Sequence, residues 1–527
     1  MGSTEVEGVS FYEIAAAHPD RPAFLGGDAP ATYGALHAQV NQLSHAFGDL
    51  GLEPGGTVAT VVGNRAEFLT VMLAALQSGL YFVPVSRHLT APEISYILSD
   101  SGARAVITEG TFASTVAGAA AEAGIPPTGR VTIDAPADDG FTGLTELMEG
   151  RPEEPPAARK MGSVMLYTSG TTGKPKGVQR PLLDYPPELP MTVLRQTLVK
   201  HLELEPGDEV HLAVGPLYHS APCIHALLAL SLGHAVVVSE RFDPEGTLGL
   251  IQRYGVTNSF MVPTMFHRML GLPAEVRARY DVSSLRQVYH SAAPIPVDTK
   301  RRMLDWWGPV LYEYYGSTES GPVVVARPEE WLDHPGTVGR PVEGVEIKIF
   351  DGSGTELPPG EPGLIYARGQ GGFEYHDDPD KTAASMLGDY YTPGDIGYLD
   401  ADGWLYMSDR RTDLIISGGV NIYPAEIEAA LLQHPDVGDV AVIGVPDEDW
   451  GQSVVALVEP ADGAVAGDEL AAALLAHCEP RLARLKHPRR IEFRPSLPRT
   501  PSGKLSRARV RESYLRELGD KGEQPVP

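Results

Sequence analysis

Helix-like and strand-like segments alternate over residues 32–108, and this alternation constrains the fold more than any other feature of the chain. Apolar residues recur at helical spacing at Leu36, Val40, Leu43 and Phe47, and a β-rich run at 57–62 follows a Pro-Gly-Gly turn. The sequence then predicts a helix at 66–76, a strand at 81–85, a helix at 92–98 and a strand at 103–108. Helices between successive strands are typical of parallel sheets, so we expect an α/β fold with a largely parallel sheet.

The rest of the chain changes character twice. A second α/β round predicts the apolar helix 223–232 and strands at 209–214, 235–238, 259–262 and 287–290. Short strands punctuated by Gly and Pro over 336–406 indicate a small β-rich unit, and the pattern after residue 410 is α+β, with helices at 425–433 and 468–477 and strands at 437–444 and 453–458. We expect residues 135–160 to form a surface connection and the C-terminal end to be a polar tail. The sequence thus predicts a large N-terminal domain of α/β layers with a small β-rich subdomain, followed by an α+β C-terminal domain.

Length and composition exclude several classes of protein. The 527 residues are too many for one typical domain, and the net charge of −27 favours a protein that nucleic acids and anionic membranes would repel. Cys223 and Cys478 cannot build a disulfide framework, and the acidic start of the chain is unlike a signal peptide. No apolar run is long enough for a transmembrane segment. We therefore expect a cytoplasmic protein without nucleic-acid partners; its oligomeric state stays open, a homodimer being one option.

The segment 481–511 is basic, in contrast to the acidic chain as a whole. It contains eleven Lys or Arg residues and the single acid Glu492. Such a segment could bind a phosphorylated cofactor, and the alternative is a solvated basic face.

The stretch Tyr167–Val178 is dense in glycines, hydroxyls and lysines. Glycine lets the backbone approach an anion, while hydroxyl and ammonium groups supply donors, so a strand entering a tight phosphate-binding loop is expected. Because Pro175, and not Ser or Thr, follows the Gly-Lys pair, the loop does not fit the Walker pattern. The nucleotide-binding residues predicted here are Thr168, Ser169, Gly170, Thr171, Thr172, Gly173 and Lys176.

Five further motifs follow this loop in order. They lie at 314–319 (Tyr-Tyr-Gly-Ser-Thr-Glu), 391–395 (Tyr-Thr-Pro-Gly-Asp), 408–410 (Ser-Asp-Arg), 417–427 (Ser-Gly-Gly-Val-Asn-Ile-Tyr-Pro-Ala-Glu-Ile) and 498–504 (Pro-Arg-Thr-Pro-Ser-Gly-Lys). Together with the loop they resemble the adenylate-forming superfamily of acyl-CoA synthetases, peptide-synthetase adenylation domains and luciferases, over essentially the whole chain. The resemblance implies an N-terminal adenylation domain at 1–409, a hinge at 410–412 and a mobile C-terminal lid domain at 413–527.

The resemblance implies an acid–thiol ligase that uses ATP, Mg²⁺ and coenzyme A. A small-molecule carboxylic acid would attack the α-phosphate of ATP, which requires charge neutralisation by Mg²⁺ and cationic donors. Glu319 is the expected magnesium ligand, assisted by Thr168, and Thr318 can hydrogen-bond phosphate. Lys504 would bridge the acyl carboxylate and the α-phosphate. A related protein without turnover would be expected to lack Glu319 or Lys504, and both are present.

The adenosine contacts implied by the family fall on four segments. Tyr315 next to Gly316 would stack on adenine, and Asp395 would accept hydrogen bonds from the ribose hydroxyls, with Arg410 reaching the ribose or phosphate. Ser291-Ala292-Ala293-Pro294 stands where the family usually has glycines lining the adenine and acyl sites. The resemblance implies that Ala292, Ala293 and Pro294 contact the nucleotide. The side chains of Ser291 and Ala292 narrow that wall, so the reach of the acyl tunnel stays open.

The acceptor half of the reaction is less constrained. His219 resembles the aromatic gate between the acyl pocket and the thiol tunnel, and the family's second domain orientation, pivoting at Thr412, would bring Ser417, Gly418 and Gly419 to the pantetheine. Trp450 resembles a coenzyme A contact. Leu485 replaces an aromatic residue that many CoA-dependent relatives have, so a carrier-protein thiol, an amine or another small nucleophile stays open as the acceptor. Aryl, medium-chain, long-chain and polycyclic side-chain acids all stay open as substrates.

Overall fold

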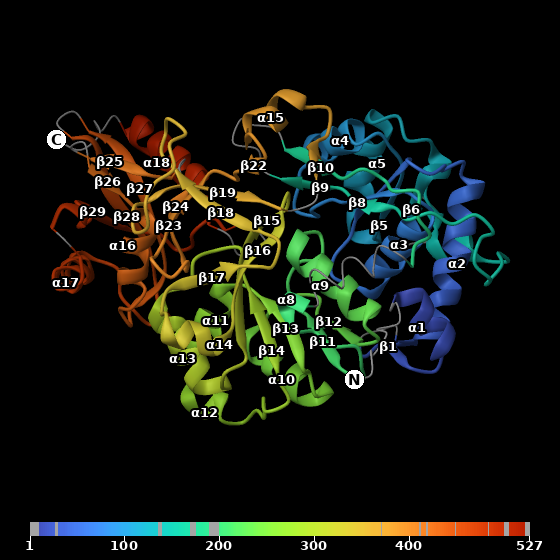
Figure 1. Ribbon diagram of the computed structural model, residues 1–527, viewed down its shortest axis with the longest axis horizontal. Helices are drawn as coiled ribbons and strands as arrows, with labels where there is room; N and C mark the ends of the chain where they lie inside the picture. Colours follow the sequence, from blue (N-terminus) through green and yellow to red (C-terminus); the bar gives the residue numbers. More distant parts are fainter. Residues whose placement is uncertain are drawn as a thin grey trace.

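The computed structural model describes residues 10–26, 30–134, 140–168, 175–188, 200–369, 372–410, 413–417, 420–447, 450–482, 484–499 and 505–521, with the backbone alone for residues 200, 409, 410, 420, 421, 485 and 519–521. Two large sheets occupy one end of the molecule and its middle, and the C-terminal elements form the opposite end (Figure 1).

The first sheet confirms the predicted alternation. Its strand order is β7-β6-β5-β3-β4-β8 and every pairing is parallel. The strands are β3 (Thr57–Val61), β4 (Tyr81–Pro84), β5 (Ala103–Thr108), β6 (Arg130–Thr132), β7 (Thr142–Gly143) and β8 (Ser163–Val164). The connecting helices are α3 (Ala66–Gln77), α4 (Ala91–Asp100) and α5 (Ala113–Glu122). The prediction of a plain connection at 135–160 is wrong for β7 and α6 (Leu144–Met148), because Leu144 and Leu147 are buried and anchor that segment.

The second sheet is parallel at its centre and antiparallel at its far side. The parallel strands are β1 (Pro22–Phe24), β12 (Ala235–Val238), β11 (Val210–Ala213), β13 (Asn258–Met261), β14 (Gln287–His290) and β15 (Leu311–Ser317), with β2 (Ala31–Thr32) antiparallel on β1. The antiparallel continuation contains β16 (Gly321–Ala326), β17 (Thr337–Pro341), β24 (Leu405–Arg410), β23 (Asp395–Leu399), β19 (Gly363–Arg368), β18 (Glu346–Phe350), β22 (Tyr390–Tyr391) and β21 (Met386–Leu387). This continuation is the predicted β-rich unit.

Further helices precede or connect the strands of the second sheet along the chain. They are α1 (Phe11–Ala17), α8 (Lys200–Leu202), α10 (Pro244–Tyr254), α11 (Pro263–Leu270), α12 (Ala274–Arg277), α13 (Val297–Trp307) and α14 (Pro328–Asp333). The two ends of helix α10 are set by residues next to them in the sequence. Asp243 caps the first turn, and Gly255 ends the helix with a φ of 60°.

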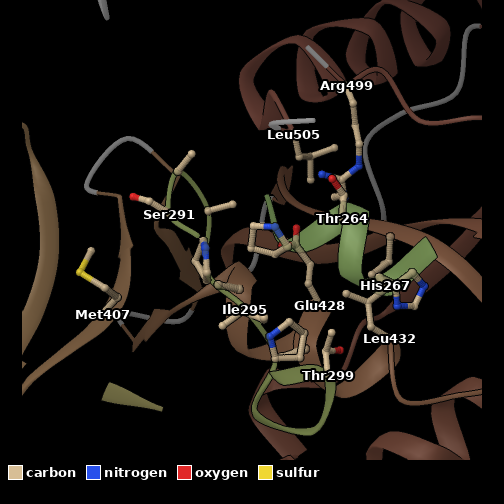
Figure 2. Close-up of a pocket in the computed structure, with 18 of the residues that line it drawn as sticks. Thr264, His267, Ser291, Ile295, Thr299, Met407, Glu428, Leu432, Arg499 and Leu505 are labelled. Carbon is tan, nitrogen blue, oxygen red and sulfur yellow. The ribbon is translucent and has the colours of Figure 1, made fainter. Parts of the chain in front are cut away.

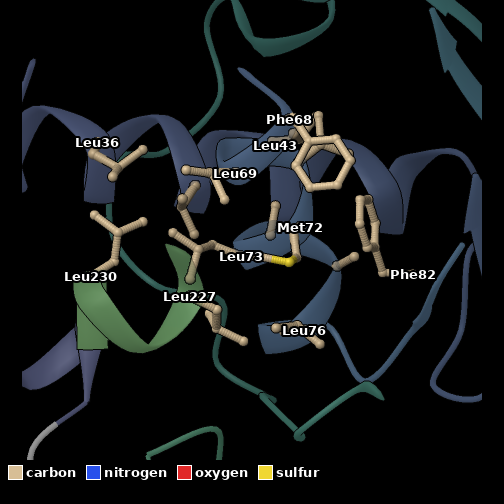
Figure 3. Packing of buried hydrophobic residues seen from close by; sticks show 14 of the residues in the cluster. Leu36, Leu43, Phe68, Leu69, Met72, Leu73, Leu76, Phe82, Leu227 and Leu230 are labelled. Carbon is tan, nitrogen blue, oxygen red and sulfur yellow. The ribbon is translucent and has the colours of Figure 1, made fainter. Parts of the chain in front are cut away.

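A layer of helices joins the two sheets into one core. Helices α2 (Tyr33–Asp49), α3 and α9 (Ser220–Ser231) bring Leu36, Met72 and Leu227 into one buried cluster, which Figure 3 shows. Because α3 is apolar on nearly all sides, it packs between other elements and does not lie at the surface.

A small third sheet stands beside the two large ones. Its order is β20-β10-β9, from β9 (Leu166–Thr168), β10 (Lys176–Gln179) and β20 (Glu374–Tyr375). Helix α15 (Pro379–Ala384) packs on β20, near β10 in Figure 1. The strand that follows the predicted phosphate loop, β10, is therefore paired with the later segment at Glu374–Tyr375.

The C-terminal part has its own cores. Strands β27 (Val437–Asp447), β28 (Gly451–Pro460) and β29 (Arg490–Phe493) form one sheet, with β25 (Ile415–Ser417) and β26 (Val420–Ile422) as a separate hairpin. Helices α16 (Pro424–Leu431) and α17 (Asp468–Cys478) cover one face, and α18 (Arg507–Lys521) covers the other. The prediction of a polar C-terminal tail is wrong up to residue 521, because Val510, Tyr514 and Leu518 bury one side of α18.

No helix among the residues described above is long and apolar enough to cross a membrane.

Candidate active site

A cavity of about 310 Å³ lies where the parallel strands β14 and β15 end and the C-terminal part begins. Ligands in open α/β sheets bind at such carboxyl ends. Figure 2 shows Ser291, Ile295 and Thr299 on one side of the cavity and Arg499 and Leu505 on the other. The two parts of the chain therefore share this site.

The predicted adenosine residues come together in this cavity. Ala292, Ala293, Pro294, Tyr315, Gly316 and Asp395 all contribute to its lining. The Tyr315 hydroxyl donates a hydrogen bond to Asp395 Oδ2 at 3.0 Å, and both residues are buried. A Cβ on Gly316 would lie 2.0 Å from the carbonyl oxygen of Gly321, so only glycine fits after Tyr315.

Ala292 has the left-handed backbone that the family's glycines would adopt without strain. Its φ is 75°, which costs an L-residue roughly 1–2 kcal/mol. Ser291 before it is buried, so the turn is held against the end of β14. This strained turn lies on the cavity wall, where stored strain is often functional.

Glu319, the predicted metal ligand, is held by a tyrosine that sequence reasoning missed. The Tyr375 hydroxyl donates to Glu319 Oε1 at 2.8 Å, and Glu319 is 7% exposed. Burial raises the pKa of Tyr375, and the neighbouring Glu319 charge raises it further, so the phenol stays a donor. The orientation of the carboxylate is thus fixed from β20.

The turn between β15 and β16 is fixed through its backbone. Arg180 Nη2 donates to the carbonyl oxygens of Thr318 and Glu319 at 3.2 and 3.0 Å. Burial lowers the pKa of Arg180, against the opposing effect of Glu319. Ser317 Oγ lies 3.2 Å from Ser320 Oγ, and the half-buried Thr318 is left at the tip of the turn.

Residues of both strands that flank the predicted phosphate loop make contacts that fix the base of the loop. Thr168 in β9 pairs with Lys176 in β10, and Tyr167 donates to Asp100 Oδ2 at 2.8 Å. Lys176 Nζ lies 4.0 Å from Asp100 and 3.9 Å from Asp378, so its charge is shared with two carboxylates. Among the predicted loop residues, Ser169, Gly170, Thr171, Thr172 and Gly173 lie outside the described residues.

His219 lies apart from the cavity lining. It precedes α9, and its carbonyl oxygen accepts from the backbone of Cys223 at 3.1 Å. Its ring centre is 4.7 Å from that of Tyr218, which is buried. Within the described residues, the structure does not bring His219 to the wall formed by Tyr315 and Asp395.

The C-terminal wall of the cavity consists of ion pairs. Arg499 Nη2 donates to Asp439 at 2.5 Å, and Arg507 donates to Asp413 at 2.9 Å and to Glu428 at 2.6 Å. All five residues line the cavity. Lys504, between Arg499 and Arg507 in the sequence, lies outside the described residues.

Four of the eleven basic residues in segment 481–511 form ion pairs with acids from elsewhere in the chain. Besides Arg499 and Arg507, Lys486 lies 2.6 Å from Glu426, and Arg494 lies 2.9 Å from Glu517. The sequence excess of basic residues therefore overstates the positive charge available to a phosphorylated ligand.

Two of the predicted acceptor residues, Ser417 and Trp450, lie on the C-terminal part and are absent from the cavity lining. Trp450 is 47% exposed, and the Arg489 guanidinium lies 4.6 Å from its ring centre. Ser417 at the end of β25 is buried. Gly418 and Gly419 lie outside the described residues, as does the side chain of Arg410.

A buried ion pair at the cavity was not predicted from the sequence. Lys300 Nζ lies 2.7 Å from Glu313 Oε2, and His290 Nε2 lies 3.6 Å from the same oxygen. Burial raises the pKa of Glu313 and lowers that of Lys300, and their mutual attraction opposes both effects. Glu313 lies two residues before Tyr315, so its pairing helps fix the end of β15.

Family models and known relatives match most of this chain. The AMP-binding enzyme family matches residues 11–375, and the AMP-binding enzyme C-terminal domain matches residues 426–504. The chain is 35% identical over 503 residues to a feruloyl-CoA synthase of an Amycolatopsis species, covering 94% of this chain and 96% of that protein. It is 33% identical over 520 residues to the fatty acid–[acyl-carrier-protein] ligase ScoC of Streptomyces coeruleorubidus, covering 97% and 96%.

A solved structure of the anthranilate CoA ligase AuaEII in complex with anthranoyl-AMP has a TM-score of 0.87, with 25% sequence identity over 98% of this chain and 100% of the other. The family matches, the relatives and the shared fold all agree with the order of motifs along the sequence. This chain belongs to the AMP-binding enzymes, the adenylate-forming superfamily that its motifs indicated.

Proposed function

We propose that this adenylate-forming enzyme activates a carboxylic acid with MgATP and then transfers the acyl group to coenzyme A. The observation that carries the proposal is the cavity in which Tyr315, Asp395 and the Ala292 turn face the segment flanking Lys504. In the first step an acid oxygen bonds to the α-phosphorus, and the bond to the β-phosphate breaks with release of pyrophosphate. In the second step a thiol displaces AMP from the acyl carbon.

The nucleotide half of the proposal rests on the buried pair of Tyr315 and Asp395. The Tyr315 hydroxyl donates to the Asp395 carboxylate, and carboxylate oxygens accept hydrogen bonds from hydroxyl groups. Asp395 would therefore accept the ribose hydroxyls while the Tyr315 ring stacks on adenine. The left-handed turn at Ala292 would keep the opposite wall close to the base.

Glu319 and Thr168 fit a magnesium ion by the chemistry of their oxygen donors. Among the described residues, no group of three or more His, Cys, Asp or Glu could hold a metal by itself. Phosphate oxygens of ATP would therefore supply other ligands. When bound, Mg²⁺ would neutralise charge on the transferring phosphates. The hydrogen bond from Tyr375 supports the role of Glu319 by fixing its carboxylate before ATP arrives.

Lys504 would neutralise charge between the acid and the α-phosphate in the first step. Its neighbours Arg499 and Leu505 line the cavity, which supports this role. Residues 413–527 would then rotate about a hinge at 410–412, with Thr412 as the pivot. The rotation would replace Lys504 and its neighbours at the site with Ser417, Gly418 and Gly419. Arg410 would contact ribose or phosphate, and His219 would gate the thiol tunnel.

Coenzyme A is the preferred acceptor because Trp450 offers an aromatic face beside a cation. The exposed ring and the Arg489 guanidinium suit an adenine and its phosphates. A carrier-protein thiol is the second candidate, since Lys486 and Arg494 of the basic segment are already paired with Glu426 and Glu517. A cytoplasmic location and a homodimer stay predictions.

The test is a panel of acids assayed for pyrophosphate with and without coenzyme A, with product masses recorded. Ferulate, anthranilate and a long-chain fatty acid come first, because the named relatives include a feruloyl-CoA synthase, an anthranilate CoA ligase and a fatty acid ligase. A mass equal to the acyl-CoA thioester is expected for at least one acid. Pyrophosphate release without any CoA adduct would instead favour the carrier protein or an amine.

A further inference from the structure

A half-buried lysine stands next to the proposed metal ligand. Lys381 lies in α15, where Asp378 Oδ1 accepts a hydrogen bond from its backbone nitrogen at 3.0 Å and fixes the first turn. Its Nζ is 3.9 Å from the centre of the Tyr375 ring. Within the described part of the chain, no carboxylate oxygen lies within 4.0 Å of this ammonium, whereas Lys176 nearby shares its charge with Asp100 and Asp378.

Tyr375 joins this lysine to Glu319. The Lys381 ammonium lies over the face of the Tyr375 ring, and the Tyr375 hydroxyl donates to Glu319 at 2.8 Å. Tyr375 also pairs with Val178 across β20 and β10, the strand that leaves the predicted phosphate loop. Lys381 is therefore placed beside both the carboxylate expected to hold Mg²⁺ and the stem of the loop.

The carboxylates of Glu319 and Asp378 attract this partly desolvated ammonium from beyond 4.0 Å, so an anion that binds it directly would still stabilise its charge. The attraction between the ammonium and the face of the Tyr375 ring contributes only roughly 0.5–2 kcal/mol. An anion that enters this site would meet an ammonium, the donors of the loop stem and a metal held by Glu319. Two negatively charged phosphates satisfy all three groups at once.

We propose that Lys381 binds the β- and γ-phosphates of ATP, the pair that leaves as pyrophosphate. The inference rests on the adenylate-forming reaction and not on the identity of the acid or the acceptor. Lys381 is here a substrate-binding residue, because its ammonium contacts the leaving group. Tyr375 is a positioning residue, since it orders Lys381 and Glu319 around the same phosphates.

The test compares ligands that contain or lack these phosphates. Lys381→Met keeps an unbranched stem on Tyr375 and removes the charge, and Lys381→Arg keeps the charge. Lys348→Met is the matched control, because Lys348 also lies over a tyrosine ring, Tyr390, at 5.8 Å, but its Nζ is 2.7 Å from Glu356. Isothermal titrations use MgATP, magnesium pyrophosphate and AMP, with neither acid nor thiol present.

Lys381→Met is expected to weaken binding of MgATP and pyrophosphate at least about tenfold, the loss of one charge-assisted contact, and to leave AMP affinity unchanged. Lys381→Arg should retain most of the pyrophosphate affinity, and Lys348→Met should match the parent protein for all three ligands. If Lys381→Met does not fold, Lys381→Gln takes its place in the same titrations. Unchanged pyrophosphate affinity, or an equal loss for AMP, overturns the proposal. Failure to find a CoA product would leave these titrations unaffected.

Discussion

The two walls of the cavity are built by different kinds of interaction. On the nucleotide side, a hydrogen bond joins two lining residues that are far apart in the sequence, Tyr315 and Asp395. On the C-terminal side, ion pairs join Arg499 to Asp439 and Arg507 to Asp413 and Glu428, all within the C-terminal part.

This difference bears on how a domain rotation could occur. Separating an ion pair in a poorly hydrated site leaves uncompensated charges and costs several kcal/mol. Because the cations that line the C-terminal wall are paired inside their own part, they would move together with their counter-charges. The nucleotide wall, by contrast, stays fixed by neutral and charged hydrogen bonds within the two large sheets. We infer that the site combines a rigid nucleotide wall with a C-terminal wall suited to move as a unit.

The largest expected effect is on Lys504. Lys504→Ala should slow acyl-adenylate formation about a hundred- to a thousandfold, because it removes the cation proposed to stabilise charge at the α-phosphate. Thioester formation from preformed acyl-adenylate should stay within about threefold of the parent rate, because Lys504 is proposed to stabilise charge in the first step only. Pyrophosphate release and thioester mass measure the two steps separately. Equal losses in both steps would show that the C-terminal wall does not act as two exchangeable faces.

Arg507 tests whether the C-terminal wall is stabilised independently. Arg507→Met removes the cation between Asp413 and Glu428 and should destabilise the C-terminal part by about 3 kcal/mol, the typical cost of breaking a buried pair. Thermal unfolding with fluorescence detection measures this, and AMP affinity should be unchanged. Arg516→Met on the same helix is the control, because that side chain is 72% exposed and should cost less than about 0.5 kcal/mol. A matching loss of AMP affinity would contradict separate stabilisation of the two walls.

Asp395 tests the rigid nucleotide wall. Asp395→Asn should weaken ATP binding by roughly 2 kcal/mol, about thirtyfold, because charged hydrogen bonds to the ribose are lost. Binding of 2′,3′-dideoxy-ATP, which lacks both hydroxyls, should be weak in the parent protein and little changed by the substitution. Tyr315→Phe keeps the ring and should change ATP affinity less than about threefold. If the substitution weakened both nucleotides equally, Asp395 would not be the ribose contact.

The sequence predicted elements and motifs better than contacts between them. The strands around Thr57–Val61 and Gln287–His290 follow from local apolar periodicity, and the adenosine residues follow from motifs that each occupy one strand end. Tyr375 and Lys381 carry no such signal, because the contact of Tyr375 with Glu319 depends on how β20 pairs with β10, and Lys381 contacts the Tyr375 ring.

Two errors have physical causes in the sequence. The spacing of Val510, Tyr514 and Leu518 was a helical signal in α18, but it was hidden by the many charged residues around it. The net charge of segment 481–511 was misleading because its acidic partners, including Glu426 and Asp439, lie earlier in the chain. A charge count over a short segment does not reveal ion pairs formed across a fold.

The smallest expected effect concerns Trp450, an exposed aromatic residue of the C-terminal part. Trp450→Ala should raise the coenzyme A concentration needed for half-maximal thioester formation about fivefold, since an exposed aromatic contact contributes roughly 1 kcal/mol. Pyrophosphate release without coenzyme A should be unchanged, because Trp450 lies outside the cavity lining. Arg489→Met should have a similar effect, as its guanidinium shares the ring. Replacing Val465, a valine that is 84% exposed elsewhere in the C-terminal part, with Ala should change neither step. Unaltered coenzyme A dependence in both Trp450→Ala and Arg489→Met would remove this surface from the thiol site and favour a carrier protein as acceptor.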